Sequence, residues 1–309
     1  MPEAPVFLRQ PHAQIGDGSG VPKEYVHLRR DDTLFVTGWS RRKDGEFSLT
    51  ARWPASAGPL PYDPRVLTQT IRQSGLVIAH AEYGVPLSHQ TLLHYFDFTV
   101  VPGFRIPSGR PSSLDIEITV SEPKHRGRTV SSLGMDVRVL QDNTLIVRAD
   151  SEFGWISPAA YRRLRGEHLT ADWGRWPLPE PVRPHSVGRT TPTDVVLAPA
   201  PDGHPHHWQL RHDAGNFLLY DHPVDHVPGL VLMEAAYQAA QAVIAPVMLE
   251  ATSVTSRFER YVEFDRPCWI QAELLPAETG GDARRSTVRV SGIQDGQTAF
   301  RGELSGPWD

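Results

Sequence analysis

The sequence predicts an α+β protein in which one unit, an antiparallel sheet wrapped around a long central helix, occurs twice. Three observations support this prediction. The chain has 309 residues, which is about twice the commonest domain size. Only two segments carry long helical signals, whereas most of the remaining chain has the pattern of strands. These elements also recur in the same order in the two halves of the chain.

The two long helical segments are apolar nearly all round, which is typical of helices enclosed on several sides. The first follows Asp63-Pro64, a capping residue and a proline suited to a first helical turn, and covers 65–80. The second covers 230–245, between Pro228-Gly229 and Pro246. We therefore expect each helix to be the buried centre of one unit.

Most other segments are expected to be strands. Alternation of apolar and polar residues predicts strands at 115–120, 258–264 and 287–290. Two hairpins are predicted at 141–144 and 294–297, where Asn143 and Gly296 are free to adopt positive φ. An antiparallel sheet can wrap around each long helix in this arrangement.

The helices and hairpins of the two halves align with one another. The aligned helix pairs are Gln73 with Gln238, Val66 with Val231, Leu67 with Leu232 and Gln69 with Glu234. The hairpins align at a shorter offset, so we expect extra residues in the first half, within the Pro-, Gly- and Ser-rich stretch 102–113. The pattern predicts a tandem (double) hot-dog fold with two pseudo-twofold related sheets.

This fold implies four regions along the chain. We expect an N-terminal extension at 1–24, a first hot-dog repeat at 25–155 and a second repeat at 193–309. The Pro-rich segment 156–192 is expected to be a stiff linker, with one short helix at 159–164.

The composition excludes several functions. With a net charge of −5 the chain has no global basic field, so neither nucleic acid nor an anionic membrane is an expected partner. The most apolar window, 229–249, is interrupted by Glu234 and Pro246 and is not expected to span a bilayer. The single cysteine, Cys268, excludes an intrachain disulfide and is expected to be a buried small hydrophobe. The segment 1–14 lacks a signal-peptide pattern, so we expect a cytoplasmic protein.

The richest candidate site is a proline-bent loop before the second long helix. It contains Asp221, His222, Asp225 and His226, and the helix that follows presents Glu234 on its second turn. Titratable groups crowded beside apolar walls are typical of active sites, so His222, His226 and Glu234 are the candidate catalytic residues. An unpaired buried carboxylate costs several kcal/mol, so Glu234 is expected to be functional or paired across the repeat.

Several motifs carry a family resemblance. In the second half they are the string 221–229, Asp-His-Pro-Val-Asp-His-Val-Pro-Gly, and Arg260-Tyr261-Val262-Glu263; in the first half they include Val26-His27, Thr37-Gly38-Trp39, Thr70-Ile71-Arg72-Gln73 and Ala79-His80-Ala81-Glu82. Over roughly 25–305 the chain resembles the A-factor biosynthesis (AfsA) hot-dog family, the γ-butyrolactone signalling-molecule synthases. The string also resembles the active-site stretch of hot-dog β-hydroxyacyl-carrier-protein dehydratases.

The family resemblance implies an acyltransferase. It would condense a β-ketoacyl group, delivered as a thioester on acyl carrier protein, with the hydroxyl of dihydroxyacetone phosphate. The ester would then cyclise towards a γ-butyrolactone or a related signalling molecule. The resemblance implies no cofactor, and the sequence leaves open whether two chains form a homodimer.

The two helices depart from the family pattern. The resemblance implies a glutamate and, three residues later, an arginine on each helix. The first helix instead has Gln69 with Arg72, and the second has Glu234 with Tyr237. Each helix has therefore lost one member of the pair.

The pseudo-twofold axis predicts that the loop of one half faces the helix of the other. His222 should then face Gln69 and Arg72, while Glu234 and Tyr237 should face the segment 55–62, which contains no histidine. Dehydration needs both an acid and a base, and a glutamine opposite His222 leaves one role unfilled. Acyl transfer needs only one base and an oxyanion site.

The backbone amides at 228–230 could supply that oxyanion site, and Arg72 could bind the phosphate of the acceptor. Arg72 could instead be a structural partner of Glu234. The other predicted substrate-binding residues are Gln69, Gln73, Asp221, Asp225, Gly229, Tyr237 and Gln238. The three glutamines among them could equally satisfy loop carbonyls.

The remaining candidates have simpler explanations. His80, Tyr83 and His89 are expected to be packing and hydrogen-bonding residues. The run 204–207, His-Pro-His-His, lacks helical spacing or nearby cysteines, so no metal site is expected. Arginines 162, 163 and 165, with Lys124, Arg126 and Arg128, could receive an acidic carrier protein or form solvated faces.

Two other functions stay open from the sequence. One is a hot-dog dehydratase or thioesterase that acts on acyl thioesters, and the other is a non-catalytic acyl-binding module.

Overall fold

The computed structural model describes residues 20–56, 60–121, 123–201, 203–276 and 284–308, whose strands form one antiparallel sheet. The strands of the first half are β1 (Val36–Lys43), β2 (Glu46–Trp53), β3 (Gln90–Val100), β4 (Ser112–Val120), β5 (Lys124–Arg126), β6 (Thr129–Gln141) and β7 (Thr144–Ile156). Those of the second half are β8 (Leu197–Pro199), β9 (His207–Leu210), β10 (Ser253–Phe258), β11 (Trp269–Leu274), β12 (Arg285–Gln294) and β13 (Gln297–Pro307).

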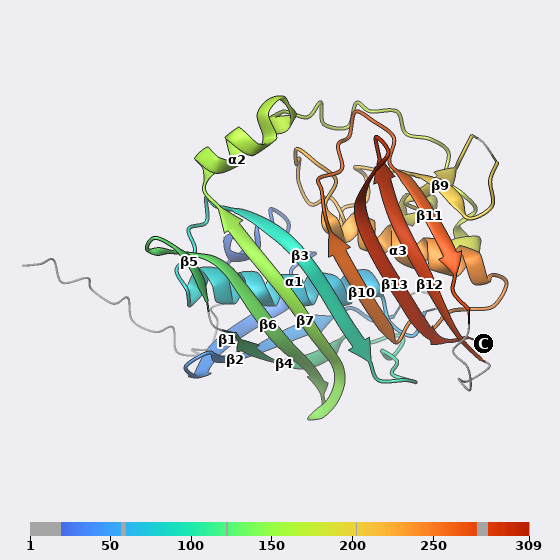
Figure 1. The fold of residues 1–309 in the computed structure, drawn as a ribbon. Helices are drawn as coiled ribbons and strands as arrows, with labels where there is room; N and C mark the ends of the chain where they lie inside the picture. The colour runs from blue at the N-terminus through green and yellow to red at the C-terminus, as the bar shows by residue number, and fades with distance from the viewer. Residues whose placement is uncertain (1–19, 57–59, 122, 202, 277–283, 309) are drawn as a thin grey trace, which may run out of the picture.

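The strand order confirms the predicted tandem hot-dog, with the difference that the two predicted sheets are joined edge to edge into one. The sheet runs β1-β2-β4-β6-β7-β3-β10-β13-β12-β11-β9-β8, with β5 paired to β6 beside this path. From the central pair β3–β10 outward, each strand of one half has its counterpart in the other, as a pseudo-twofold axis requires. The two halves join where Phe98 pairs with Val254, and Figure 1 shows them side by side.

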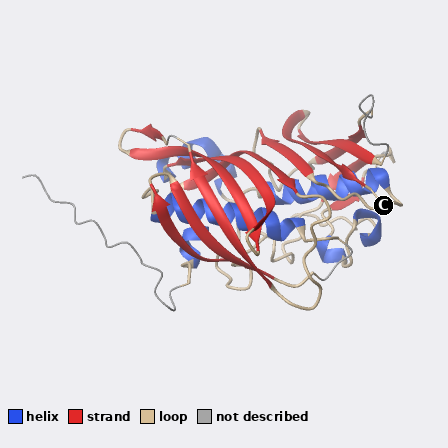
Figure 2. Cartoon of the chain, turned by 90° about the horizontal axis from the view of Figure 1, so that it is seen from below, coloured by secondary structure: helices blue, strands red, loops and turns tan. Residues whose placement is uncertain are grey.

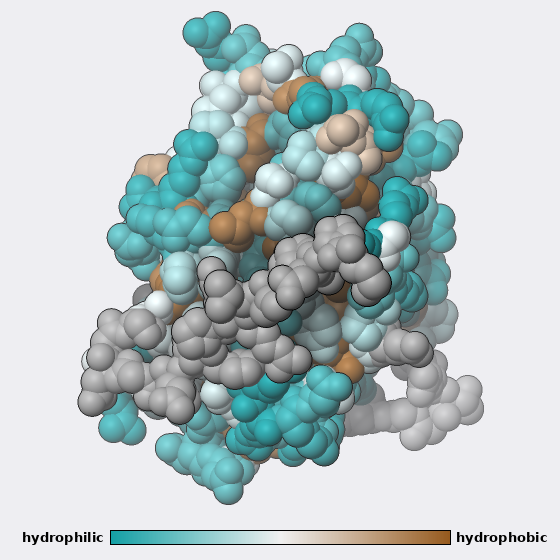
Figure 3. Space-filling view, turned by 90° about the vertical axis from the view of Figure 1, so that its left-hand side faces the viewer, coloured by the Kyte–Doolittle hydropathy of each residue, from teal (hydrophilic) through white to brown (hydrophobic). Residues whose placement is uncertain are grey.

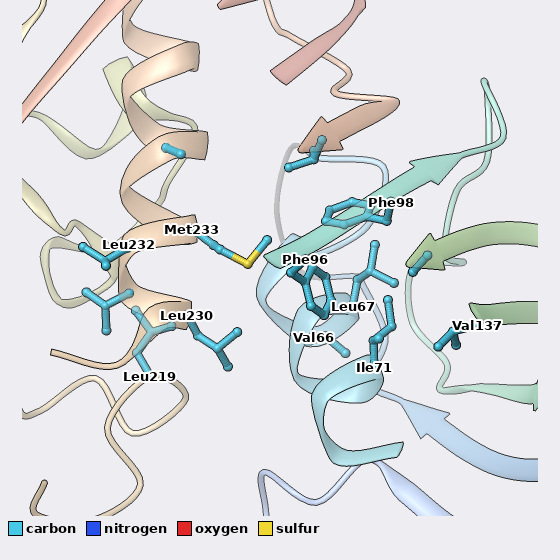
Figure 4. Close-up of a cluster of buried hydrophobic side chains, with 14 of the residues drawn as sticks. Val66, Leu67, Ile71, Phe96, Phe98, Val137, Leu219, Leu230, Leu232 and Met233 are labelled. Atoms are coloured by element: carbon cyan, nitrogen blue, oxygen red, sulfur yellow. The ribbon is translucent and has the colours of Figure 1, made fainter. Parts of the chain in front are cut away.

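The long helices α1 (Pro64–Ala81) and α3 (Gly229–Ile244) lie on the same face of the sheet (Figures 1 and 2). The α1 helix begins as predicted, because the side chain of Asp63 accepts a hydrogen bond from the amide of Arg65. Most residues of both helices are buried. At the joint between the halves, Met233 of α3 points toward Leu67 and Phe96 (Figure 4). One continuous core therefore links the two repeats.

Gln73 and Gln238 show how closely the repeat is kept. The Oε1 atom of Gln73 accepts from the amide of Phe35 at 2.8 Å, and its Nε2 donates to the carbonyl of Thr33 at 2.7 Å. Gln238 makes the same pair of bonds in the second half, with Val196 at 3.0 Å and Asp194 at 2.7 Å. Both glutamines fix the loop that leads into the first strand of their repeat.

The hairpins follow the prediction, but the strand predicted after Phe258 does not form. Asp142, Asn143, Asp295 and Gly296 have φ values of 48°, 61°, 52° and 70°. The strand predicted at 258–264 ends at Phe258, because the next residues leave the sheet and Val262 instead pairs with the loop before α3 through Val227.

The extra residues of the first half lie in its strands and not at 102–113. Strands β3, β4 and β6 have 11, 9 and 13 residues, whereas their counterparts β10, β11 and β12 have 6, 6 and 10. The loops after β3 and β10 are of similar length. A longer strand extends the ladder of hydrogen bonds, so the sheet absorbs the added residues.

The linker packs against the second repeat. Its predicted helix is α2 (Pro158–Arg165), and further along Trp176 lies parallel to Phe264 with ring centroids 4.1 Å apart. The indole of Trp176 also donates to the carbonyl of His212. In Figure 3, hydrophobic residues form only small separate groups on the end of the molecule that faces the viewer. None of the described helices is long and apolar enough to cross a membrane.

Candidate active site

A cavity of about 780 Å³ lies where the two repeats meet. Its walls come from α1, β3, α2, the first turn of α3 and the loops 219–228 and 259–266. Of the residues singled out from the sequence, it brings together Gln69, Arg72, Asp221, His222, His226 and Gly229. The others, Gln73, Asp225, Glu234, Tyr237 and Gln238, do not line it.

Asp221 and His222 form an oriented pair in this cavity. The backbone amides of Arg29 and Arg30 donate to the Asp221 carboxylate at 2.6 and 2.9 Å. His222 Nδ1 is 2.9 Å from the same carboxylate, which can only accept, so Nδ1 carries the proton. The Nε2 atom then carries a lone pair, and the described chain gives it no partner. This is the arrangement of a histidine that acts as a general base.

Asp225 and His226 form a second pair of the same kind. His226 Nδ1 lies 2.8 Å from the Asp225 carboxylate, which also accepts from Tyr161 at 2.7 Å and from Arg165 Nε at 3.0 Å. Burial opposes the charge, but the bonds from His226, Tyr161 and Arg165 hold the pKa of Asp225 well below its usual range. Asp225 thus stands behind His226 and fixes its ring.

Arg165 is a structural residue and not part of a solvated basic face. Its guanidinium binds Glu263 through two hydrogen bonds of 2.6 and 2.7 Å, in addition to Asp225, and its side chain is 3% exposed. It also lies over the ring of Tyr261, 4.4 Å from the ring centroid. The sequence left open a carrier-protein contact or a solvated face for Arg165, and both are wrong because the side chain is buried and two carboxylates already neutralise it. Arg162 and Arg163 are exposed.

Arg72 faces the cavity without a carboxylate partner. Its guanidinium donates to the carbonyl of Val26 at 3.3 Å, and the described chain places no acid within salt-bridge distance. Burial lowers the pKa of Arg72 to about 10, partly offset by the charge of Asp221. An unpaired guanidinium in a partly apolar cavity is a ready receptor for an anion such as phosphate.

Three further polar groups in the cavity wall lack partners. Gln69 donates through Nε2 to the carbonyl of Leu218 at 2.9 Å, which leaves its buried Oε1 without a donor. The hydroxyls of Tyr220 and Tyr261 are also buried and unpartnered. Burial raises the pKa of Tyr261 to about 12, so its hydroxyl stays a donor at neutral pH. Buried polar groups normally find partners, and these three atoms find none within the described residues.

The first turn of α3 supplies amide donors. Pro228 at the N-cap offers no side-chain acceptor, and no hydrogen bond within the described residues uses the amides of Gly229 or Leu230. A Cβ at Gly229 would lie 2.9 Å from the ring of Phe258, so this close packing requires glycine. The helix end is therefore open toward the cavity.

Glu234 of α3 aligns with Gln69 of α1, and unlike Gln69 it is fully paired. Arg189 binds its carboxylate through two hydrogen bonds of 2.6 and 2.7 Å, and Gln238 donates to it as well. Glu234 and Arg189 are only 2% and 7% exposed. Arg189, the partner of Glu234, belongs to the linker and lies beside the second repeat, which also contains Glu234. The expectation that Glu234 pairs across the repeat, with Arg72 as a candidate partner, is therefore wrong. Tyr237 is near Tyr62, and burial raises its pKa well above the usual range.

Sequence reasoning missed several residues of the site. Tyr220 directly precedes the Asp221 motif, and Tyr261 belongs to a motif that was recognised, so adjacency could have identified both. Tyr161 and Arg189 lie in linker segments without a motif, and only the folded chain brings them to Asp225 and Glu234.

Comparisons with known proteins identify the family of this chain. The family model described as "A-factor biosynthesis hotdog domain" matches residues 10–157 and 174–306. A protein of Streptomyces virginiae named 2-oxo-3-(phosphooxy)propyl 3-oxoalkanoate synthase is 42% identical over 287 residues, which cover 91% of this chain and 96% of that protein. Proteins of the same name from Streptomyces coelicolor and Streptomyces griseus subsp. griseus are 36% and 34% identical; the matches cover 93% and 99% of this chain and 91% and 99% of those proteins.

Among solved structures, a Lactobacillus plantarum protein described as an oleoyl thioesterase is similar with a TM-score of 0.50 and 13% identity. The match covers 84% of this chain and 95% of that one. At this identity the similarity concerns the fold alone.

Proposed function

Because this chain belongs to the A-factor biosynthesis hotdog family, we propose that it is an acyltransferase that joins a 3-oxoacyl group to the hydroxyl of dihydroxyacetone phosphate. The name of the relatives describes an ester of a 3-oxoalkanoic acid with a 2-oxo-3-(phosphooxy)propyl alcohol. That alcohol is dihydroxyacetone phosphate. The acyl donor is proposed to be a thioester, because an activated acid is needed for ester formation.

One observation carries the proposal: an oriented histidine base, His222, and an unpaired guanidinium, Arg72, share one cavity. The acceptor has a phosphate at one end and a reactive hydroxyl at the other. Arg72 would bind the phosphate and hold the hydroxyl near His222. A thioesterase acting on water would have no need of a buried anion receptor.

The reaction needs one base and one oxyanion site. Nε2 of His222 takes the proton of the acceptor hydroxyl while its oxygen attacks the thioester carbonyl. The amides of Gly229 and Leu230 stabilise the negative charge on the carbonyl oxygen. The intermediate then collapses, the carbon–sulfur bond breaks, and the imidazolium of His222 returns its proton to the departing thiolate. Glu234 has no role in this scheme, because Arg189 holds it outside the cavity.

His226 and Tyr261 are proposed to contact the acyl donor. Their rings pack against each other with centroids 4.5 Å apart, and both line the cavity. The unpartnered hydroxyl of Tyr261 can donate to the 3-oxo oxygen, while Asp225 keeps His226 in place. This contact would favour a 3-oxoacyl chain over a saturated one.

A carrier protein is the proposed source of the thioester. Leu164 of α2 is 59% exposed and lines the cavity, with exposed Arg162 and Arg163 beside it. An apolar contact flanked by positive charge suits the acidic surface of an acyl carrier protein. Since both proposed substrates are metabolites of the cytoplasm, the proposal places the reaction there.

Mass spectrometry of the products tests the function. The protein is incubated with a 3-oxoacyl carrier protein and dihydroxyacetone phosphate, and the expected product is the phosphorylated ester. Release of free 3-oxo acid as the main product would show a thioesterase, and loss of water from a 3-hydroxyacyl thioester would show a dehydratase. Either outcome would refute the proposal.

A further inference from the structure

His27 combines an unfavourable backbone conformation with a place in the cavity wall. It follows the 3₁₀ turn η1 (Lys23–Val26) with φ 55°, a left-handed conformation that L side chains disfavour. In the second repeat the turn η3 (Pro184–Val187) ends in the same way at Gly188, with φ 68°. Glycine adopts this conformation without steric cost. The first repeat therefore keeps a histidine where the framework favours glycine, and such strain gathers at functional sites.

The hydrogen bonds of His27 fix where its protons are. His80 Nδ1 lies 2.7 Å from the carbonyl oxygen of Val85, so Nδ1 carries the proton. Burial lowers the pKa of both histidines below the usual value of about 6.5, so both are neutral at pH 8. His80 Nε2 therefore has a lone pair and accepts from His27 Nε2, which lies 2.8 Å away. The remaining nitrogen of His27, Nδ1, can only accept, and the described chain gives it no partner.

This acceptor lies beside the proposed phosphate site. The guanidinium of Arg72 donates to the carbonyl of Val26, the residue before His27. Burial, and then the charges of Arg72, His80 and His222, lower the pKa of His27 to about 3. The charge of Asp221 raises the pKa of Arg72, and that of His89 lowers the pKa of His80. An anion bound by Arg72 would thus meet a neutral imidazole with a free lone pair.

We propose that His27 binds the phosphate of the acceptor substrate through one proton shared between its Nδ1 and a phosphate oxygen. The inference rests on the proposed function, because the phosphate is that of dihydroxyacetone phosphate. Two groups that carry only lone pairs repel each other, so a proton must lie between them. A dianionic phosphate takes this proton from solvent when it binds, whereas a monoanionic phosphate brings its own. Arg72 binds the other phosphate oxygens.

Calorimetry of dihydroxyacetone phosphate binding tests the inference. Titrations in two buffers of different ionisation enthalpy give the number of protons taken up. At pH 8 the free phosphate is a dianion, since its second pKa is about 6, so about one proton should be taken up per ligand bound. At pH 5 the phosphate is mostly a monoanion, and uptake should fall towards zero.

Three variants separate His27 from its neighbours. His27→Gly should bind about tenfold more weakly and take up almost no proton at pH 8, and Gly188 shows that the turn accepts glycine. His222→Gln should keep the proton uptake, which excludes His222 as the group that is protonated. His80→Leu removes the acceptor of His27 Nε2–H, so the His27 tautomer is no longer fixed and both affinity and uptake should fall by a smaller factor.

The outcomes distinguish this inference from the proposed function. Binding to the wild type without proton uptake at pH 8, or equal uptake by His27→Gly, would overturn the role of His27 alone. A purely structural role would change the stability of the His27 and His80 variants and leave the proton number unchanged. If dihydroxyacetone phosphate did not bind at all, the proposed function would fail as well.

Discussion

The cavity beside α1 and the corresponding place beside α3 share one framework, yet ligand-facing groups line the first and paired side chains fill the second. Beside α3, Glu234 is neutralised by Arg189. At the equivalent places beside α1, Gln69 keeps an unpartnered oxygen and Leu28 forms part of the cavity wall. The two sites therefore differ at two aligned positions, Glu234 against Gln69 and Arg189 against Leu28. The polar groups are paired within the protein at the first site of each comparison, and Gln69 Oε1 is left without a partner at the second.

The first turns of the two helices also differ, because α1 has a side-chain cap and α3 has none. The carboxylate of Asp63 caps α1 and accepts from the amide of Arg65 at 2.9 Å. The aligned residue of the other repeat, Pro228, has no side-chain acceptor and leaves the first amides of α3 open. Duplication thus preserved the framework bonds of Gln73 and Gln238 while the functional positions diverged.

The largest expected effect concerns the base in the open site. His222→Gln should lower kcat by roughly 10³- to 10⁴-fold, because general-base catalysis is lost while the ring's space is kept by an amide. Initial rates of ester formation measure this, with the exposed His125→Gln as a matched control that should retain full activity. If His226→Gln caused the larger loss, the two Asp-His pairs would have to exchange roles.

Breaking the ion pair in the filled site should affect stability instead. Arg189→Leu leaves Glu234 buried without a partner and should lower the free energy of unfolding by about 3 kcal/mol or more. The double variant Arg189→Leu with Glu234→Gln reproduces the Leu28 and Gln69 pair and should recover most of this loss. Urea denaturation gives both values. A double variant no more stable than the single one would contradict the assigned pairing.

Capping α3 in the way that α1 is capped should close the oxyanion site. In Pro228→Asp the new carboxylate would accept from the amide of Leu230, as Asp63 does from Arg65, and kcat should fall by roughly 100-fold. Pro228→Ala removes the ring without adding a carboxylate and serves as the control. Equal activity of the two variants would show that these amides do not bind the oxyanion.

The smallest expected effect is on the pH dependence of stability. The folded-state pKa of His27, about 3, is below its unfolded value of about 6.5, so the folded protein binds fewer protons and loses stability as the pH falls from 6.5 towards 3. His27→Gly should remove this loss and gain about 2 kcal/mol over the wild type at pH 5, which lies about 1.5 pH units below the unfolded pKa, beyond any gain at pH 8. Denaturation at both pH values measures it, and a gain independent of pH would contradict the shifted pKa.

The sequence allowed the tandem fold to be predicted because its signals are local. Asp63 and Pro64 mark a helix start, and the residues around Asn143 and Gly296 mark tight turns. One exception, 258–264, has the alternation of a strand, but Val262 pairs with a loop that only the tertiary structure brings near.

The site could be predicted only in part. His222 and Arg72 stand in recognisable motifs, and the pseudo-twofold axis indicates that they share a cavity. The Arg189–Glu234 pair has no sequence signal, because it depends on where a linker without a motif docks. The positive φ of His27 could not be predicted either, because no residue type next to it indicates a left-handed conformation.

The seam between β3 and β10 has a kinetic consequence. Phe98 and Val254 are paired although they are much farther apart in the sequence than the two strands of any hairpin. Contacts of large sequence separation form slowly, so this pairing is among the last to form during folding. Because the cavity lies between the repeats, each repeat can be fully ordered and the chain still inert. Recovery of activity after refolding should therefore lag behind recovery of secondary structure.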